Sequence, residues 1–168
     1  MANFRNCFWN ASKDQFTNLI WSDEFDYTGA IDPDKWTHEV REQWFNNEVQ
    51  STTSLLENSK VEDGKLKITA IKKANGDYTS ARIRTYKKLD FTYGRIDVKA
   101  KMPSKTNGVW PAIWLLGSNY ESIDWPACGE MDIQSMLIQI ISTFNLLYIN
   151  QMVMLVKEIL MLPTTTPI

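Results

Sequence analysis

Alternation of polar and apolar residues constrains the fold of this chain more than any other feature. The segments Lys65–Ile71 and Arg95–Met102 both alternate in this way. Successive side chains of a strand point to opposite faces, so each segment predicts a β-strand with one buried and one exposed face. Between such segments lie residues that favour turns, namely Glu62-Asp63-Gly64, Asn75-Gly76-Asp77, Tyr93-Gly94 and Pro103-Ser104. Several short strands at this spacing, with no long helical periodicity before residue 135, predict an all-β antiparallel sandwich.

Size and charge limit the architecture and the partners of the chain. Its 168 residues suffice for one domain with a sizeable core. The net charge is −2 and both signs are well mixed, which argues against nucleic acid or an anionic membrane as a partner, and we expect a monomer. His38 is the only histidine, so no histidine-based triad or metal cluster is predicted, and we expect it on the surface of a strand. Cys7 and Cys128 are expected as free thiols, because two cysteines do not make a disulfide framework.

The composition changes abruptly near residue 135. Residues 1–135 hold all seven tryptophans and all seven glycines, whereas residues 136–168 have neither and carry only Lys157 and Glu158 as charges. The apolar run 136–149 is shorter than the roughly 20 residues that span a bilayer. A membrane anchor is therefore the least favoured interpretation of this tail, while a packed helix, a strand pair and an aberrant sequence stay open. We predict three parts, which are a lead-in (1–19), a domain (20–135) and an atypical apolar tail (136–168).

The segment Glu130-Met131-Asp132-Ile133-Gln134-Ser135 places two acids on one strand. Alternation puts Glu130 and Asp132 on the same face and Met131 and Ile133 on the other. We expect Met131 and Ile133 in the core and both acids facing a groove. An exposed acidic strand without any chemistry is the alternative, and the neighbouring sequence decides between the two.

A series of short sequence motifs, in a fixed order, resembles those of a known protein family, and we refer to these motifs as words. The words are Trp21-Ser22-Asp23-Glu24-Phe25-Asp26, Ile31-Asp32-Pro33-Asp34-Lys35-Trp36, Asn46-Asn47-Glu48-Val49-Gln50, Val61-Glu62-Asp63-Gly64-Lys65-Leu66, Tyr78-Thr79-Ser80-Ala81-Arg82, Tyr93-Gly94-Arg95, Gly108-Val109-Trp110-Pro111-Ala112-Ile113-Trp114-Leu115-Leu116 and Trp125-Pro126-Ala127-Cys128-Gly129-Glu130. Over roughly residues 20–135 the chain resembles glycoside hydrolase family 16, the laminarinase and lichenase group. The resemblance implies a jelly-roll (concanavalin A-like) β-sandwich that is incomplete at its C-terminal side.

The resemblance implies roles for three positions of the acidic strand. Glu130 matches the nucleophile that forms a covalent glycosyl-enzyme, and Asp132 matches the helper acid beside it. The family pattern Glu-x-Asp-x-x-Glu ends in the general acid/base, and this chain has Ser135 there. An offset of five has the wrong parity for a regular strand, so such enzymes need a β-bulge to bring both ends of the motif to one face. A serine cannot protonate the leaving oxygen, and loss of general acid assistance typically costs about 10²–10⁴-fold in rate.

Aromatic and polar residues in the same words match the substrate cleft of the family. Trp110 and Trp125 match positions that stack on glucose rings. Trp114 is four residues from Trp110 and so would lie on the same face of a strand, although a role in the core is an equal alternative for Trp114. Asn46 and Arg82 match polar residues of the negative subsites, with a surface charge as the alternative for Arg82. Trp21, Trp36 and Trp44 are expected to have packing roles.

The resemblance implies an endo-β-glucanase that cleaves β-1,3-glucan, or mixed-linkage β-1,3-1,4-glucan, with retention of configuration. The word Trp-Pro-Ala-x-Gly-Glu favours laminarinase over lichenase. No cofactor is implied; structural calcium occurs in some members, but the sequence shows no ligand set. The family is mostly secreted, yet residues 1–5 lack the apolar run of a signal peptide, so the compartment stays open. The alternatives to an impaired enzyme are a non-catalytic glucan-binding protein and an inactive gene product.

The serine and the atypical tail begin at the same place, which points to a shift of reading frame. One choice among the synonymous codons for Gln134–Ile140, CAG AGC ATG TTA ATA CAA ATA, encodes Glu-His-Val-Asn-Thr-Asn in a shifted frame, so the shift is permitted by the residues rather than required by them. Glu followed by His or Tyr and then Val is how the family motif usually continues. At Met152-Val153 every codon choice yields a glycine in the shifted frame. We hypothesise that residues from about 134 onward are translated from a shifted frame.

Sequencing of the gene region tests this hypothesis. We expect a one-base change just upstream of the codon for Ser135, followed by a second frame that continues the family-like sequence. A clean codon series with no family-like frame downstream would contradict the hypothesis and would make Ser135 a true substitution.

Overall fold

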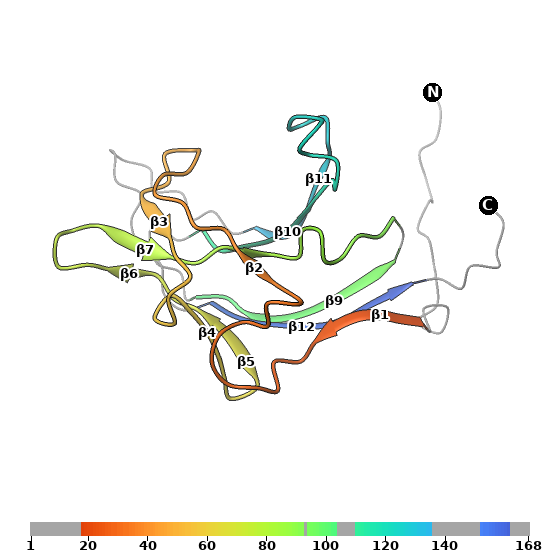
Figure 1. The fold of residues 1–168 in the computed structure, drawn as a ribbon, viewed down its shortest axis with the longest axis horizontal. Coiled ribbons are helices and arrows are strands. Elements are labelled where there is room, and N and C mark those ends of the chain that lie inside the picture. The colour runs from red at the N-terminus through yellow and green to blue at the C-terminus, as the bar shows by residue number, and fades with distance from the viewer. Residues whose placement is uncertain (1–17, 93, 104–109, 136–151, 162–168) are drawn as a thin grey trace, which may run out of the picture.

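The structure, a computed structural model, describes residues 18–92, 94–103, 110–135 and 152–161, and every regular element in these ranges is a strand (Figure 1). The strands are β1 (Asn18–Asp23), β2 (Thr37–His38), β3 (Gln50–Thr52), β4 (Ser59–Glu62), β5 (Lys65–Ile68), β6 (Ile71–Lys72), β7 (Tyr78–Ser80), β8 (Ile83–Arg84), β9 (Arg95–Lys101), β10 (Ala112–Leu116), β11 (Glu130–Ser135) and β12 (Met152–Met161). No helix in the described part is long and apolar enough to cross a bilayer. The all-β fold predicted from alternation is confirmed.

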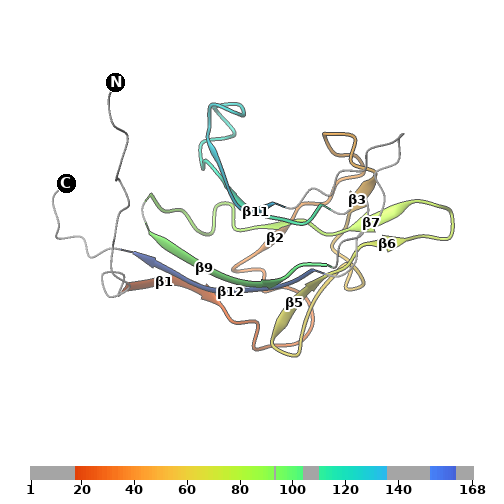
Figure 2. The same cartoon turned by 180° about the vertical axis from the view of Figure 1, so that it is seen from behind.

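The largest sheet has five strands and is built around β12. One side of β12 pairs with β9, and its other side pairs with β5 and then with β1, while β4 pairs with β5. The smaller sheets of the described part are β2–β8, β3–β7–β6 and β10–β11. Figures 1 and 2 show β2 and β10 in a second layer above β9, β12 and β1. The strand pairs are antiparallel, as predicted, except that β3 and β7 are parallel.

The β4–β5 hairpin shows how alternation builds the larger sheet. Val61 pairs with Leu66, and both are 0% exposed, while the lysines beside them face outward. Asp63 and Gly64 turn the chain with φ of 55° and 65°. Such left-handed conformations match a two-residue hairpin turn, which the sequence predicted here. The strand predicted over residues 65–71 is split, because β5 ends at Ile68 and β6 begins a different sheet.

The core lies between the two layers. Its buried members are Phe25, Ile31, Trp36, Val61, Leu66 and Ile68. From the second layer, Ile83 of β8 and Ile113 of β10 pack against them. Trp21 also packs there, with its ring centroid 5.2 Å from that of Trp36 in an edge-on arrangement. The predicted packing roles of Trp21, Trp36 and Trp44 are confirmed, since Trp21 and Trp36 pack in this cluster and Trp44 is buried outside it.

A buried carboxyl group fixes the chain at the end of β1. Asp23 is 1% exposed and accepts hydrogen bonds from the Phe25 amide (3.1 Å), the Tyr27 hydroxyl (3.3 Å) and the Trp36 indole Nε1 (2.7 Å). Three donors compensate for the removal of the carboxyl group from water. Burial, together with this neighbouring carboxylate, raises the pKa of Tyr27 to about 12.

The pair β2–β8 separates a core face from a charged face. His38 pairs with Ile83, and the ladder continues where the Glu39 amide donates to the Arg82 carbonyl (2.8 Å). Because Ile83 packs on the core, its partner His38 points inward too, where its Nε2 lies 2.6 Å from Ser59 Oγ. The prediction that His38 lies on the surface is therefore wrong, although its place in a strand is confirmed. Glu39 and Arg82 belong to the opposite face.

Part of the atypical tail forms β12. Met152–Met161 pairs along its backbone with β1, β5 and β9, which corresponds to a packed strand among the interpretations left open by the sequence. The rest of the tail, the lead-in before residue 18 and Cys7 lie outside the described residues. Unpaired strand edges accept extended segments through backbone groups alone, so β12 does not decide the reading frame.

Acidification is expected to weaken the fold through His38. Burial lowers the pKa of His38 below its ordinary value of 6.5. Below that pH the unfolded chain binds a proton at this residue that the folded chain resists. The stabilising contribution is therefore present above pH 6.5 and is lost as the pH falls toward the folded-state pKa. Thermal melts between about pH 7.5 and about pH 5 should show a falling midpoint, with a shallower fall in His38→Gln. Equal slopes for the two proteins would contradict this account.

Candidate active site

Strands β10 and β11 pair with one irregularity, and it lies at Ile133. The register is Leu116 with Glu130, Leu115 with Met131, Trp114 with Asp132, Ile113 with Gln134 and Ala112 with Ser135. Ile133 has no partner in this ladder, so it is the extra residue of a β-bulge. Positions 130, 132 and 135 therefore all lie opposite alternate residues of β10. The bulge predicted from the spacing of the motif is confirmed.

The acids share a face with Trp114. Ile113 packs on the core, so Trp114 points to the opposite side of β10. Asp132 and Glu130 are registered opposite Trp114 and Leu116 and have the same orientation. Both acids are exposed. We call this side of β10–β11, together with the Glu39 and Arg82 side of β2–β8, the site face.

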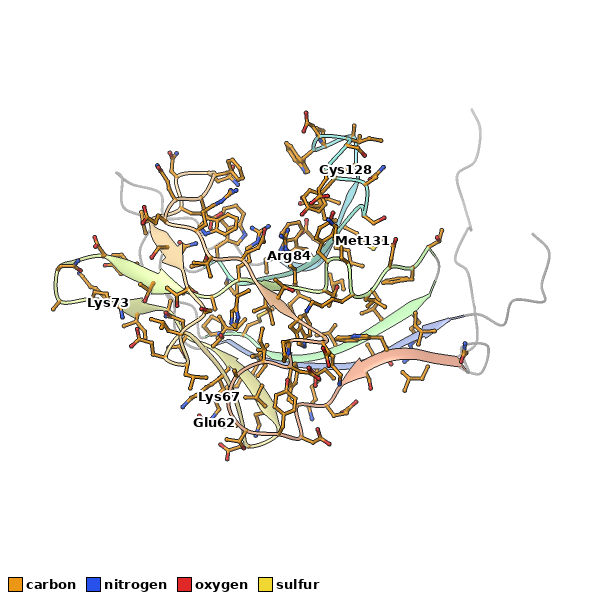
Figure 3. All side chains as sticks on the ribbon, in the orientation of Figure 1. Glu62, Lys67, Lys73, Arg84, Cys128 and Met131 are labelled. Carbon is orange, nitrogen blue, oxygen red and sulfur yellow. The ribbon has the colours of Figure 1, made fainter. Side chains whose placement is uncertain are left out.

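The expectation that Met131 and Ile133 lie in the core is wrong. They are 65% and 41% exposed. The sheet β10–β11 has two strands in the described part, and β11 projects away from the other layer (Figures 1 and 3). No described strand covers the side of β11 opposite the acids, and Ile133 is in addition the bulged residue.

Arg82 joins the two halves of the site face. Its guanidinium lies 4.8 Å from the centre of the Trp114 ring and 4.4 Å from that of Trp44, and its Nε is 2.7 Å from Glu39 Oε2. Trp44 is itself anchored, because its Nε1 donates to Thr52 Oγ1 (3.1 Å). A guanidinium placed over aromatic rings gains a cation–π attraction. Arg82 is thus an ordered member of the site rather than a free surface charge, and Trp114 belongs to the site face rather than to the core.

The connection between β10 and β11 carries Trp125 and is held both at its base and at Tyr120. At its base the Gly117 amide donates to the Gly129 carbonyl (2.9 Å). Further along, the Tyr120 hydroxyl accepts a hydrogen bond from Arg84 Nη1 (2.6 Å). Trp125 is 66% exposed on this loop. The loop therefore presents an indole to solvent from a fixed support.

Two further contacts tie the same loop to the segment after β8. The Tyr86 and Tyr120 rings meet edge to face at 4.9 Å, and Lys87 Nζ is 3.3 Å from Glu121 Oε2. Hydrogen bonding to the Glu121 carboxylate raises the pKa of Tyr86, and the same bond lowers the pKa of Glu121. Lys87 and Glu121 are exposed, so the contact orients the loop more than it stabilises the chain.

The remaining predicted site residues lie at exposed positions on separate loops. Trp110 is 38% exposed and precedes β10. Asn46 lies in a turn closed by a hydrogen bond from the Glu48 amide to the Phe45 carbonyl (3.1 Å), with φ of 57°. The structure brings Arg82 and Trp114 into contact, whereas Asn46, Trp110 and Trp125 each come from a different segment.

Metal ligands and thiols add nothing to the site in the described ranges. No group of three or more His, Cys, Asp and Glu side chains that could hold a metal ion occurs there. Cys128 is a half-buried free thiol, as predicted.

Glu39, Arg84 and Tyr120 belong to the site face but were not predicted. A signal existed for Arg84, because it shares strand parity with Arg82. The contact of Arg84 with Tyr120 joins residues 36 positions apart, which no local pattern reveals.

The chain is similar to a protein family and to several proteins whose names refer to β-glucan. A family model described as beta-glucan synthesis-associated protein SKN1/KRE6/Sbg1 matches residues 6–122. The beta-glucanase of Rhodothermus marinus is 46% identical over 121 residues, which are 68% of this chain and 42% of that protein. The chain therefore spans less than half the length of this curated relative.

Two solved structures share the fold. A glutamate-to-serine variant of LamA from Z. galactanivorans, in complex with laminaritriose and laminaritetraose, matches with a TM-score of 0.64 and 46% identity, over 71% of this chain and 56% of that one. A serine mutant of SCLam, a non-specific endo-beta-1,3(4)-glucanase from family GH16, matches with a TM-score of 0.65 and 37% identity, over 71% of this chain and 52% of that one. These likenesses confirm the predicted jelly-roll fold for the matched part.

Substitution of Gly117 by alanine is expected to displace the loop that carries Trp125. A Cβ at Gly117 would lie 1.9 Å from the carbonyl oxygen of Cys128, which is backbone and cannot give way unless the loop moves. We expect a lower midpoint of thermal unfolding and a changed tryptophan emission spectrum. Ser118→Ala, at the exposed neighbouring position, is the control and should change neither. If the two variants behave alike, the close approach at Gly117 does not constrain the loop.

Proposed function

The chain belongs to glycoside hydrolase family 16, and on this premise we propose that it acts on β-1,3-glucan, or on mixed-linkage β-1,3-1,4-glucan, through a retaining double displacement that lacks its general acid. The observation that carries the proposal is the bulged register of β11, which brings positions 130, 132 and 135 to one face beside Trp114. The chain spans about half the length of its solved relatives. The activity of those longer proteins is therefore a proposal when it is applied to this chain.

Glu130 is proposed as the nucleophile and Asp132 as its helper. A retaining glycosidase needs one carboxylate that attacks the anomeric carbon and forms a glycosyl-enzyme. Glu130 is exposed on the site face and can approach a sugar there. Asp132 lies two residues further along the same face, about 7 Å of strand away, on the same side as the proposed nucleophile.

Position 135 is where the second catalytic group would be needed. The glycosidic oxygen takes up a proton as its bond to the anomeric carbon breaks, and a second carboxylic acid normally supplies it. A serine hydroxyl has no acidity near neutral pH. We therefore expect the first step on natural glucan to be slower by about 10²–10⁴-fold than in a relative with the acid. Substrates whose leaving group needs no proton should lose much less.

The substrate would bind along the site face by stacking and by hydrogen bonds. The exposed indoles of Trp110 and Trp125 offer apolar surfaces to sugar rings. Arg82 is held over Trp44 and Trp114, and the N–H groups that it does not use for Glu39 would donate to sugar hydroxyls. Asn46 adds an exposed amide from its own turn. Together these groups support a role in binding an extended glucan chain.

A non-catalytic glucan-binding protein is the second candidate. One observation favours it, namely the serine at position 135. A LamA variant with a serine in place of a glutamate is described in complex with laminaritriose and laminaritetraose, so such a replacement is compatible with sugar binding in that protein. The presence of both Glu130 and Asp132 favours the impaired enzyme instead.

Ser135→Glu is expected to raise the hydrolysis of laminarin by about 10²-fold or more, because it supplies the missing proton donor. Release of reducing ends measures this, and proton NMR of the first product reports whether the anomeric configuration is retained. Glu130→Gln in the Ser135→Glu background is the control and should abolish hydrolysis. Glucan binding by a folded Ser135→Glu protein that shows no hydrolysis would reject the enzyme and favour the binding protein.

A further inference from the structure

We propose that Glu39 is a positioning residue of the site, which holds Arg82 and Arg84 in place and thereby sets the spacing between the tryptophan wall and the Trp125 loop. The inference rests on the proposed function for its effect on glucan binding. Its structural part, the placement of the two arginines, can be measured without any glucan.

The carboxylate of Glu39 divides its two oxygens between two guanidinium groups. Oε2 lies 2.7 Å from Arg82 Nε and Oε1 lies 3.0 Å from Arg84 Nη1. The backbone of Glu39 is fixed as well, because its amide donates to the Arg82 carbonyl (2.8 Å) and its carbonyl accepts from Thr52 Oγ1 (2.6 Å). Its side chain is 20% exposed, so water screens these pairs less than at an open surface. Glu39 is thus the common point of both arginines.

On one side this carboxylate directs Arg82 to the tryptophan wall, defined as Trp44 and Trp114. The Arg82 guanidinium lies 4.4 Å from the Trp44 ring centre and 4.8 Å from that of Trp114. Trp114 is registered opposite Asp132. A displacement of Arg82 would therefore also displace the Trp114 indole, which lies opposite Asp132.

On the other side the same carboxylate directs Arg84 to the loop that carries Trp125. Arg84 Nη1 donates to the Tyr120 hydroxyl (2.6 Å), and its guanidinium lies 5.0 Å from the Tyr86 ring centre. Arg84 Nε is buried and has no hydrogen-bond partner in the described part. Loss of Glu39 would leave Arg84 with the Tyr120 hydroxyl as its remaining hydrogen-bond acceptor there.

The negative charge of Glu39 explains how one residue can hold both arginines in place. Two guanidinium groups stay charged at any ordinary pH and are held close together by one carboxylate. Neutralising that carboxylate leaves like charges that repel, so Arg82 and Arg84 should separate. Because one arginine contacts the tryptophan wall and the other contacts the loop, both parts of the site should shift together.

Glu39→Gln tests the inference, with Glu62→Gln as the matched control. Glu62 also bridges two cations, Lys60 (2.9 Å) and Lys67 (2.6 Å), but Figure 3 shows Glu62 and Lys67 at the lower edge of the molecule, away from Arg84. Near-ultraviolet circular dichroism should change in Glu39→Gln and not in Glu62→Gln, since only the former disturbs tryptophans. The dissociation constant for laminarihexaose should rise about tenfold in Glu39→Gln alone, a size typical of coupling between contacting residues.

A mutant cycle separates positioning from simple loss of stability. If Glu39 acts through Arg82 and Arg84, adding Glu39→Gln to a variant that already carries Arg82→Gln and Arg84→Gln should weaken laminarihexaose binding by less than twofold more. Full additivity of the two losses, or equal dichroism spectra for wild type and Glu39→Gln, would overturn the inference. If the wild type binds no laminarihexaose, the proposed function fails, and the dichroism comparison alone then decides the placement of the arginines. Should Glu39→Gln not fold, Glu39→Asp, which is too short to reach both arginines, takes its place in every comparison.

Discussion

The contact between the Arg82 guanidinium and the Trp114 ring is the interaction on which the site depends. Arg82 extends from the segment before β8, and Trp114 from β10, so the contact joins two small sheets that share no backbone hydrogen bonds. The alternation of side chains along β8 and β10 then determines which residues lie on the site face. Ile83 and Ile113 point into the core from these strands, and their neighbours must point to the site face. The acids follow, because Asp132 is registered opposite Trp114.

The tail after residue 135 affects whether the serine at position 135 is interpreted as a substitution or as the start of a shifted reading frame. In sequence it departs from the family at that position, and in the structure its residues 152–161 complete a five-stranded sheet. These two observations are compatible, because backbone pairing along β1, β5 and β9 does not require family side chains. The shifted frame stays a prediction. A chain that carries the proposed nucleophile Glu130 and the proposed helper acid Asp132, but a segment unlike the family after them, is the simplest account of both.

Much of the fold could be predicted from the sequence because its physics is local. The β4–β5 hairpin follows from alternation and from Asp63 and Gly64, and the bulge at Ile133 follows from the parity of the acidic motif. What the sequence could not give depends on contacts between distant segments. His38 is inward because its partner Ile83 is inward. Met131 is exposed because β11 projects, although its apolar character predicted the core.

The residues of the site also divide into those that could be predicted from the sequence and those that depend on contacts between distant segments. Family resemblance supplied Glu130, Asp132 and Arg82, whereas Glu39 was missed, since nothing in its own neighbourhood marks a carboxylate shared by two arginines. Only the pairing of β2 with β8 brings the three charges together. Residues that position other residues are in general harder to predict than residues that touch a substrate.

Hydrogen–deuterium exchange in the presence of laminarihexaose tests the central claim most directly, because it locates the glucan on the chain. The account predicts slower exchange of backbone amides in β8, β10 and β11 and in the segment from Glu39 to Asn46, with the β4–β5 hairpin unchanged as an internal control. Slower exchange confined to β4–β5, or no change anywhere at saturating oligosaccharide, would contradict it.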